Sequence, residues 1–226
     1  MMRRLGLVAA IVILALLAGG GYTALAGAAV YQDLDAGRQA LVGAQASMMA
    51  AARTGDLAGL QSAASQLKLA EQHFNDARSR SGSDPALRLV AGIPRAGRQL
   101  GASTHLAAIG ADMSRAGEAA AEVAIQVAAL KQKYAGRALT PDDLQAALQE
   151  AQAIARTYSA SIQAISQQLR AAHAERAEID TAELVGPLKD AYDAVDRALA
   201  EADTSFRRYQ DVRQVLSDFL GVQLPP

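Results

Sequence analysis

Three histidines are the side chains in this sequence that are best suited to bind a metal ion. His73, His105 and His173 lie far apart, and none has a second histidine four residues away, the spacing that places two ligands on one face of a helix. His173 and Glu175 are two residues apart, so on a helix they would point in different directions. Cysteine is absent, which excludes thiolate metal sites and disulfides. The sequence predicts no metal site and no cofactor.

Acidic and glycine-rich segments are the next places where chemistry could occur. Asp142 and Asp143 form an acidic pair, but they follow Thr140 and Pro141, which are typical of an N-cap and a first helical position. Negative charge at that position stabilises the start of a helix. The glycines at 19–21 belong to no phosphate-binding motif, and no serine lies in a G-x-S-x-G segment. We therefore predict that the chain is not an enzyme.

Basic residues concentrate between positions 78 and 98, where the sequence offers only Asp76 and Asp84 as neighbouring acids. The basic side chains are Arg78, Arg80, Arg88, Arg95 and Arg98. They form either a basic surface patch that could meet anionic headgroups or an ordinary solvated turn. Because the net charge of the whole chain is only −1 and both signs are mixed along it, nucleic acid is not expected as a partner.

The N-terminal part of the chain has the pattern of a membrane span. No residue from Leu5 to Gln32 is charged, and this stretch is longer than the ~20 residues that cross a bilayer. Arg3 and Arg4 precede it, whereas Asp33 and Asp35 follow it. The positive-inside rule then predicts a single-pass protein of the cell membrane, with a cytoplasmic N-terminus and the remainder outside the cytoplasm.

A cleaved signal peptide is the alternative interpretation of the same segment. Ala24, Leu25 and Ala26 form an A-x-A-like cleavage site after a basic start and an apolar stretch. Small and apolar residues nevertheless continue past the glycines at 19–21 into the next predicted helix without a breaker. This continuity favours a signal anchor that is retained.

Apolar residues after the N-terminal segment recur at alternating steps of three and four, as in helices that pack through a coiled-coil-like seam. No segment alternates with the period of a strand. Aromatic residues make up only 4% of the chain, so the seams consist mainly of alanine and leucine and favour long, closely packed helices. We predict an all-α fold.

The first two predicted helices are joined by a turn at residues 53–56, and this short turn makes them antiparallel. The first seam comprises Leu34, Gly37, Leu41, Ala44, Met48 and Ala51. The second comprises Leu60, Ala63, Leu67, Ala70, Phe74 and Ala77.

Three longer helices follow an elbow that Pro85 and Pro94 delimit. The third seam comprises Leu106, Ile109, Met113, Ala116, Ala120, Val123, Val127, Leu130 and Tyr134. The fourth comprises Leu144, Leu148, Ala151, Ala155, Tyr158, Ile162, Ile165, Leu169 and Ala172. The fifth comprises Leu188, Ala191, Val195, Ala198, Ala202, Ser205, Tyr209, Val212, Leu216 and Phe219.

These observations give a predicted domain organisation. It consists of an N-terminal transmembrane anchor over residues 1–31, an antiparallel helical hairpin over 32–80, the elbow over 81–97, three long helices over 98–221, and a C-terminal tail over 222–226.

Two stretches of the first 134 residues resemble a known family. The residues that carry the resemblance are Gly55, Asp56, Leu57, Ala63, Leu67, Ala70, Phe74 and Ala77, followed by Leu89, Ile93, Pro94, Gly97, Leu100 and Leu106. Their pattern is similar to the N-terminal, membrane-anchored helical region of the bacterial domain-of-unknown-function 4012 family. In that family the helices lead into a larger downstream domain, which is missing here, so this chain is expected to be a truncated or a stand-alone helical form. The resemblance implies an envelope protein and no activity that can be carried over.

Continuous seams without a catalytic constellation predict a membrane-anchored stalk or interaction module of the bacterial cell envelope. Its expected partners are the membrane and other envelope proteins, and oligomers are possible. Two alternatives remain: an extracytoplasmic sensor-type bundle, and the helical part of an envelope protein associated with polysaccharide. The sensor interpretation lacks a second apolar run that could lead to a cytoplasmic output.

Overall fold

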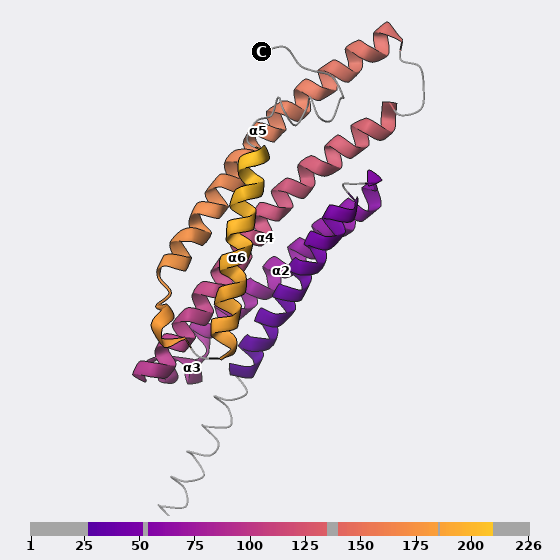
Figure 1. The fold of residues 1–226 in the computed structure, drawn as a ribbon. Helices are drawn as coiled ribbons and strands as arrows, with labels where there is room; N and C mark the ends of the chain where they lie inside the picture. Colours follow the sequence, from indigo (N-terminus) through magenta and orange to yellow (C-terminus); the bar gives the residue numbers. More distant parts are fainter. Residues whose placement is uncertain (1–26, 52–53, 135–139, 185, 210–226) are drawn as a thin grey trace, which may run out of the picture.

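The computed structural model describes residues 27–51, 54–134, 140–184 and 186–209, and these residues form a helical bundle without strands (Figure 1). The predicted all-α fold is therefore confirmed for this part of the chain. Most of the predicted anchor, residues 1–26, and the segment 210–226 lie outside the described residues. Among the residues described, no helix has the length and apolar character needed to cross a bilayer.

The first described helix covers residues 27–51 and packs against α2, Leu57–Ser83, as a hairpin. Asp56 caps α2 by accepting a hydrogen bond from the Ala58 amide, and Gly55 supplies the positive φ of 72° that the turn requires. All six predicted seam residues of α2 are buried. The turn and the seam of the hairpin are thus as predicted.

Phe74 of α2 fits between two glycines of neighbouring helices. A Cβ atom added to Gly37 would lie 2.9 Å from the Phe74 ring, and one added to Gly110 would lie 2.6 Å from it. Ala70 and Ala111 are the other buried residues of this cluster, and Leu34 and Leu41 pack against it. One large ring therefore fills the space that three closely spaced backbones leave.

The predicted elbow is largely helical. Its centre is α3, Pro85–Ala91, which Asp84 caps through the amides of Ala86 and Leu87. The helix α4, Pro94–Tyr134, begins inside the range 81–97 that we assigned to the elbow. Proline lacks an amide hydrogen and is well suited to a first helical position, so Pro94 starts a helix here as well as ending one.

The first turn of α4 comes very close to the end of α3 at Gly97. A Cβ atom on Gly97 would lie 2.3 Å from the carbonyl oxygen of Ala91, so only glycine allows α4 to leave α3 at this angle.

The long helix α4 is the centre of the bundle because it carries two seams rather than the single one that we predicted. Leu106, Ile109 and Met113 of the predicted seam face the C-terminal helices. A second face packs against the hairpin, and its buried residues are Ala107, Ala111, Ala121 and Ala128. The sequence pattern missed this face because alanine at every turn gives weak contrast between a buried and an exposed side.

The helix α5, Pro141–Ala177, returns along α4 (Figure 1). Thr140 accepts a hydrogen bond from the Asp143 amide while the Asp143 carboxylate accepts one from the Thr140 amide, so the predicted N-cap is a full capping box. Tyr158, Leu169 and Ala172 of the predicted seam are buried.

A connection with the short 3-10 helix η1, Thr181–Glu183, leads to α6, Pro187–Tyr209. The seam of α6 differs in part from our prediction, because Leu199 rather than Ala198 is its most buried side chain, at 1% exposure. Tyr192 and Phe206 accompany Leu199 against α4 and α5. The expected continuation of this seam through Val212, Leu216 and Phe219 lies outside the described residues.

The resulting molecule is a rod with two distinct ends (Figure 1). One end holds the start of the first helix, α3, the start of α4 and the connection between α5 and α6. Val30, Ala77, Leu87 and Ala107 meet there in one apolar cluster. The opposite end holds the end of α4 and the start of α5.

Candidate functional site

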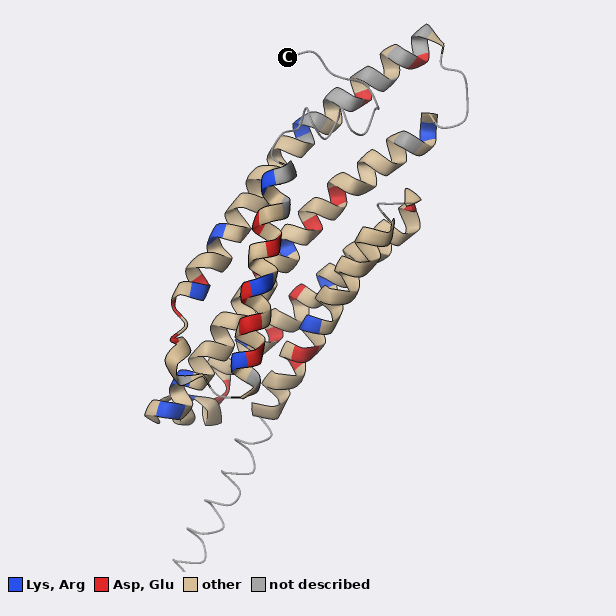
Figure 2. Cartoon of the chain, in the orientation of Figure 1, with Lys and Arg blue, Asp and Glu red and all other residues tan. Residues whose placement is uncertain are grey.

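The structure places the five arginines of the predicted basic patch around one end of the rod, and all five side chains are exposed. Arg78 and Arg80 lie in the last turns of α2, Arg88 lies on α3, and Arg95 and Arg98 lie in the first turns of α4. Figure 2 shows basic residues at this end around α3. The fold thus gathers these residues at one end.

Acids from distant parts of the sequence also reach this end, which the sequence did not reveal. Arg80 Nε forms an ion pair of 2.8 Å with Asp33 Oδ2 on the first helix. Arg88 donates a hydrogen bond of 3.0 Å to the Gly82 carbonyl oxygen. Our expectation that only Asp76 and Asp84 lie near the arginines is therefore wrong, because packing of the first helix against α2 brings Asp33 alongside.

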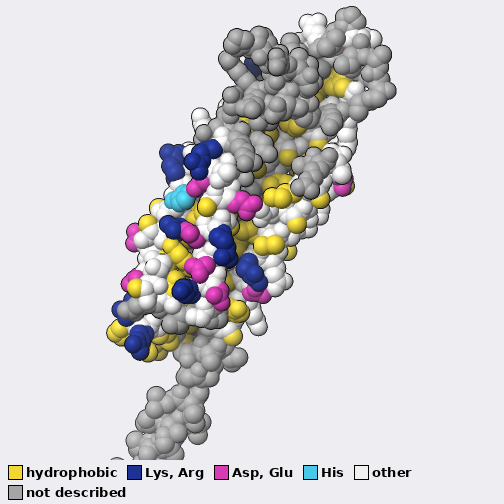
Figure 3. Space-filling model, in the orientation of Figure 1, with side chains coloured by type: hydrophobic (Ala, Val, Ile, Leu, Met, Phe, Trp, Pro, Cys, Tyr) yellow, Lys and Arg dark blue, Asp and Glu magenta, His cyan; other side chains and the backbone are white. Residues whose placement is uncertain are grey.

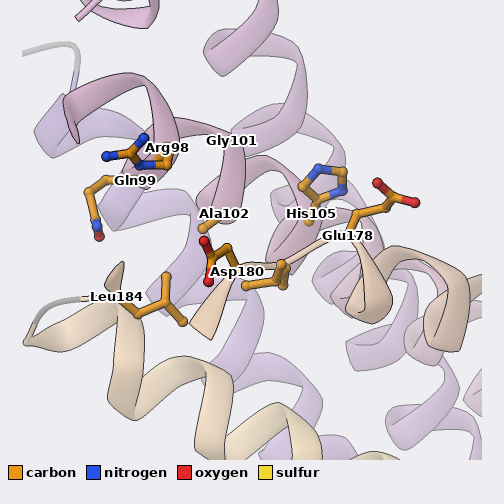
Figure 4. A pocket seen from close by; sticks show the side chains of 9 residues that line it. Arg98, Gln99, Gly101, Ala102, His105, Glu178, Asp180 and Leu184 are labelled. Atoms are coloured by element: carbon orange, nitrogen blue, oxygen red, sulfur yellow. The ribbon is translucent and has the colours of Figure 1, made fainter. Parts of the chain in front are cut away.

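A small hollow lies beside Arg98, between the first turns of α4 and the connection after α5 (Figure 4). Arg98, Gln99 and His105 line it from α4, and Glu178 and Asp180 line it from the connection. Its volume is about 200 Å³, below the roughly 300–1,000 Å³ of typical ligand pockets.

Two of the three histidines pair with carboxylates across helix interfaces. His105 Nδ1 lies 2.6 Å from Glu175 Oε2, which joins α4 to α5. His173 Nε2 lies 2.9 Å from Asp203 Oδ2, which joins α5 to α6. His173 and Glu175 thus point to different neighbours, as their spacing predicts. In the described ranges no group of three or more His, Asp or Glu side chains could hold a metal ion.

A cluster of charged side chains that we did not predict from the sequence lies between α2 and α4. Arg115 of α4 contacts Glu71 of α2 at 2.7 Å and Asp112 at 2.8 Å. Burial raises the pKa of Asp112, against the opposing effect of Arg115. Burial, followed by the negative charge of Glu71, also raises the pKa of Glu118. The arginine between acids on two helices indicates a structural network.

Exposed apolar side chains are the most unusual feature of the arginine-rich end. Leu89 is 78% exposed and Ile93 is 55% exposed, whereas Leu87 on the same short helix is buried. Figure 3 shows hydrophobic and basic side chains together at this end of the rod. We define the elbow surface as Arg88, Leu89, Ile93 and Arg95. The apolar run from 87 to 93 was visible in the sequence, but only the packing shows which of its residues face outward.

No family model, curated protein or solved structure matches this chain. The resemblance to the domain-of-unknown-function 4012 family stays a prediction.

Proposed function

We propose that this protein is a membrane-anchored, non-catalytic helical stalk of the bacterial cell envelope, with its bundle outside the cytoplasm. The observation that carries the proposal is the place of residues 27–32 in the fold. The uncharged stretch from Leu5 to Gln32 runs into this helix at the arginine-rich end of the rod. A span formed by that stretch would join the rod at one end and leave the other end free.

The dimensions of the bundle support a spacer role. The helix α4 has 41 residues, which corresponds to about 60 Å at 1.5 Å per residue. Because α2 and α5 pack along it, this length belongs to a bundle rather than to an isolated helix. Such a rod would hold envelope partners at its far end or along its flanks, tens of ångströms from the bilayer.

The side chains nearest the proposed span also suit a membrane boundary. Tyr31, in the second turn of the first described helix, is 54% exposed. Tyrosine is enriched where protein meets the headgroup region, because its ring is apolar and its hydroxyl is polar. The ion pair between Arg80 and Asp33 lies at the same end and would remain in contact with water or headgroups.

Fractionation of cells that express the full chain tests the anchor. We expect the protein in the membrane fraction after an alkaline wash, and we expect external protease to remove residues after about 30. Ile13→Asp with Leu16→Asp should release it, because charge in the apolar core opposes insertion.

The signal-peptide alternative predicts a different product. A cleaved protein would be soluble and would begin near Gly27, and Ala26→Leu would block its processing and increase its size. For an anchored protein the same substitution should leave size and fractionation unchanged. A soluble wild-type product whose size depends on Ala26 would refute the anchor.

A further inference from the structure

We propose that the elbow surface is a second contact with the membrane, in which Leu89 and Ile93 enter the headgroup region of an anionic bilayer while Arg88 and Arg95 meet its phosphates. This inference rests on the proposed anchor and adds a lipid-binding site to it. The rod would then touch the membrane at two places.

The short helix α3 has both buried and exposed apolar side chains. Leu87 packs with Val30 and Ala107, so α3 is fixed to the bundle by one side. Leu89 and Ile93 are four residues apart at the end of α3 and lie outside this contact. The Ile93 amide donates a hydrogen bond to the Val90 carbonyl oxygen, so the turn continues as far as Ile93. The two side chains are 78% and 55% exposed at the same end of the rod, and exposed apolar surface beside polar residues is typical of sites that contact a protein or a membrane.

Basic residues flank the two exposed apolar side chains. Arg88 precedes Leu89, and Arg95 follows Ile93 after a single proline. Arginine can lay its methylene groups along an apolar surface while its guanidinium stays with phosphate oxygens. Segments that lie in the interface of anionic membranes combine apolar side chains with basic residues, as the elbow surface does.

The position of the elbow surface favours a bilayer over a protein as the partner. Val30 and Leu87 belong to one apolar cluster, so α3 lies near Val30 of the first described helix. The uncharged stretch of the sequence ends at Gln32, in the same helix. If this stretch spans the membrane, the elbow surface is held at the height of the headgroups without any change in the bundle.

Site-specific quenching in vesicles tests the contact on the full chain. The protein has no cysteine, so Leu89→Cys gives a single site for an environment-sensitive fluorophore. Val42→Cys is the matched control, because Val42 is 58% exposed but lies about 18 Å further along the first helix than Val30. Each labelled protein is reconstituted into vesicles of phosphatidylcholine, or of phosphatidylcholine with phosphatidylglycerol, that carry a lipid-attached quencher.

We expect quenching at position 89 to exceed that at position 42 several-fold, and to be stronger in the anionic vesicles. Arg95→Gln with Arg88→Gln, or ~1 M salt, should reduce quenching at position 89, because screening weakens attraction to phosphates. Equal quenching at both positions in anionic vesicles would overturn the proposal.

The test separates this proposal from the anchor. If an alkaline wash removes the chain from the vesicles, the anchor fails, but quenching at position 89 can still be measured before the wash. Quenching there in anionic vesicles would support lipid binding by the elbow surface, and its absence would overturn it. A chain that resists the wash without quenching at position 89 would leave the anchor intact and refute the second contact.

Discussion

The acidic side chains between α2 and α4 show how the fold changes the properties of individual residues. Glu118 is half-buried on α4, and both burial and the nearby Glu71 carboxylate make its ionised form less favourable. Lys68 and Arg115 oppose this effect, but less strongly than burial raises the pKa. At neutral pH the ionised Glu118 therefore destabilises the native state.

The raised pKa has a defined consequence for stability. Between the unfolded value, about 4.5, and the higher folded value, the native state binds more protons than the unfolded state, so stability falls as pH rises through this window. Glu118→Gln removes the charge and should raise the melting temperature at pH 7. Below pH 4.5 the carboxyl is protonated in both states, and the substitution should have little effect.

Thermal unfolding followed by circular dichroism at pH 4 and pH 7 measures this difference. Glu122→Gln is the control, because Glu122 is exposed one turn away on the same helix. An equal gain at both pH values for Glu118→Gln would show that the network does not disfavour its charge.

At the scale of elements, α4 holds the bundle together because small residues let other helices approach it from two sides. Gly110 faces the Phe74 ring, and Gly117 faces Leu67, with distances of 2.6 Å and 2.8 Å from an added Cβ atom. Gly101 lies on the same helix, and an added Cβ atom there would meet nothing within 4 Å. Gly110 and Gly117 thus allow neighbouring side chains to pack closely on α4, whereas Gly101 has no neighbour that requires a glycine.

We expect Gly110→Ala to destabilise the protein by about 1–3 kcal/mol, because the methyl group would overpack against Phe74. Gly101→Ala should stabilise it by about 0.5–1 kcal/mol, because alanine favours the helix and meets no neighbour. Denaturant unfolding of both variants measures the two effects.

A double variant identifies the cause. Phe74→Leu removes the edge of the ring, so it should be less harmful in the Gly110→Ala background than in the wild type. Additive effects of the two substitutions would show that Gly110 and Phe74 do not contact each other as described.

At the scale of the whole molecule, the hairpin and α6 differ in how extensively they pack against the rest of the bundle. The hairpin packs along α4 through four apolar clusters. The helix α6 contributes to one apolar cluster, which it shares with α4 and α5. Among the described side chains of residues 187–209, Leu199 is the single buried one. We therefore expect α6 to open before the hairpin does.

Hydrogen exchange on the full chain can resolve this order. Leu199→Ala should weaken packing by about 2–5 kcal/mol and accelerate exchange of α6 amides by at least about 30-fold, with little change in α2. Leu60→Ala, which removes an equally buried leucine of α2, is the matched control and should accelerate exchange in the hairpin. Equal acceleration of both regions by Leu199→Ala would indicate a single cooperative unit.

The sequence by itself determined the long helices and much of what they bury, although not that the elbow is largely helical. The turn at Gly55 and Asp56, the capping box at Thr140 and the six buried positions of α2 were all predicted, because caps and seam spacing are local properties. It also located the arginine-rich segment. Each of these features is caused by residues that are close together in the sequence.

Only the tertiary structure decided how the surfaces are used. The second seam of α4, the pairing of Arg80 with Asp33, the shift of the α6 seam to Leu199 and the exposure of Leu89 all depend on which helices meet. Alanine is nearly as compatible with a buried as with an exposed position, so an alanine-rich helix does not encode its own partners. Contacts between segments distant in the sequence supply that information, because burial is a property of the packed bundle and not of any one helix.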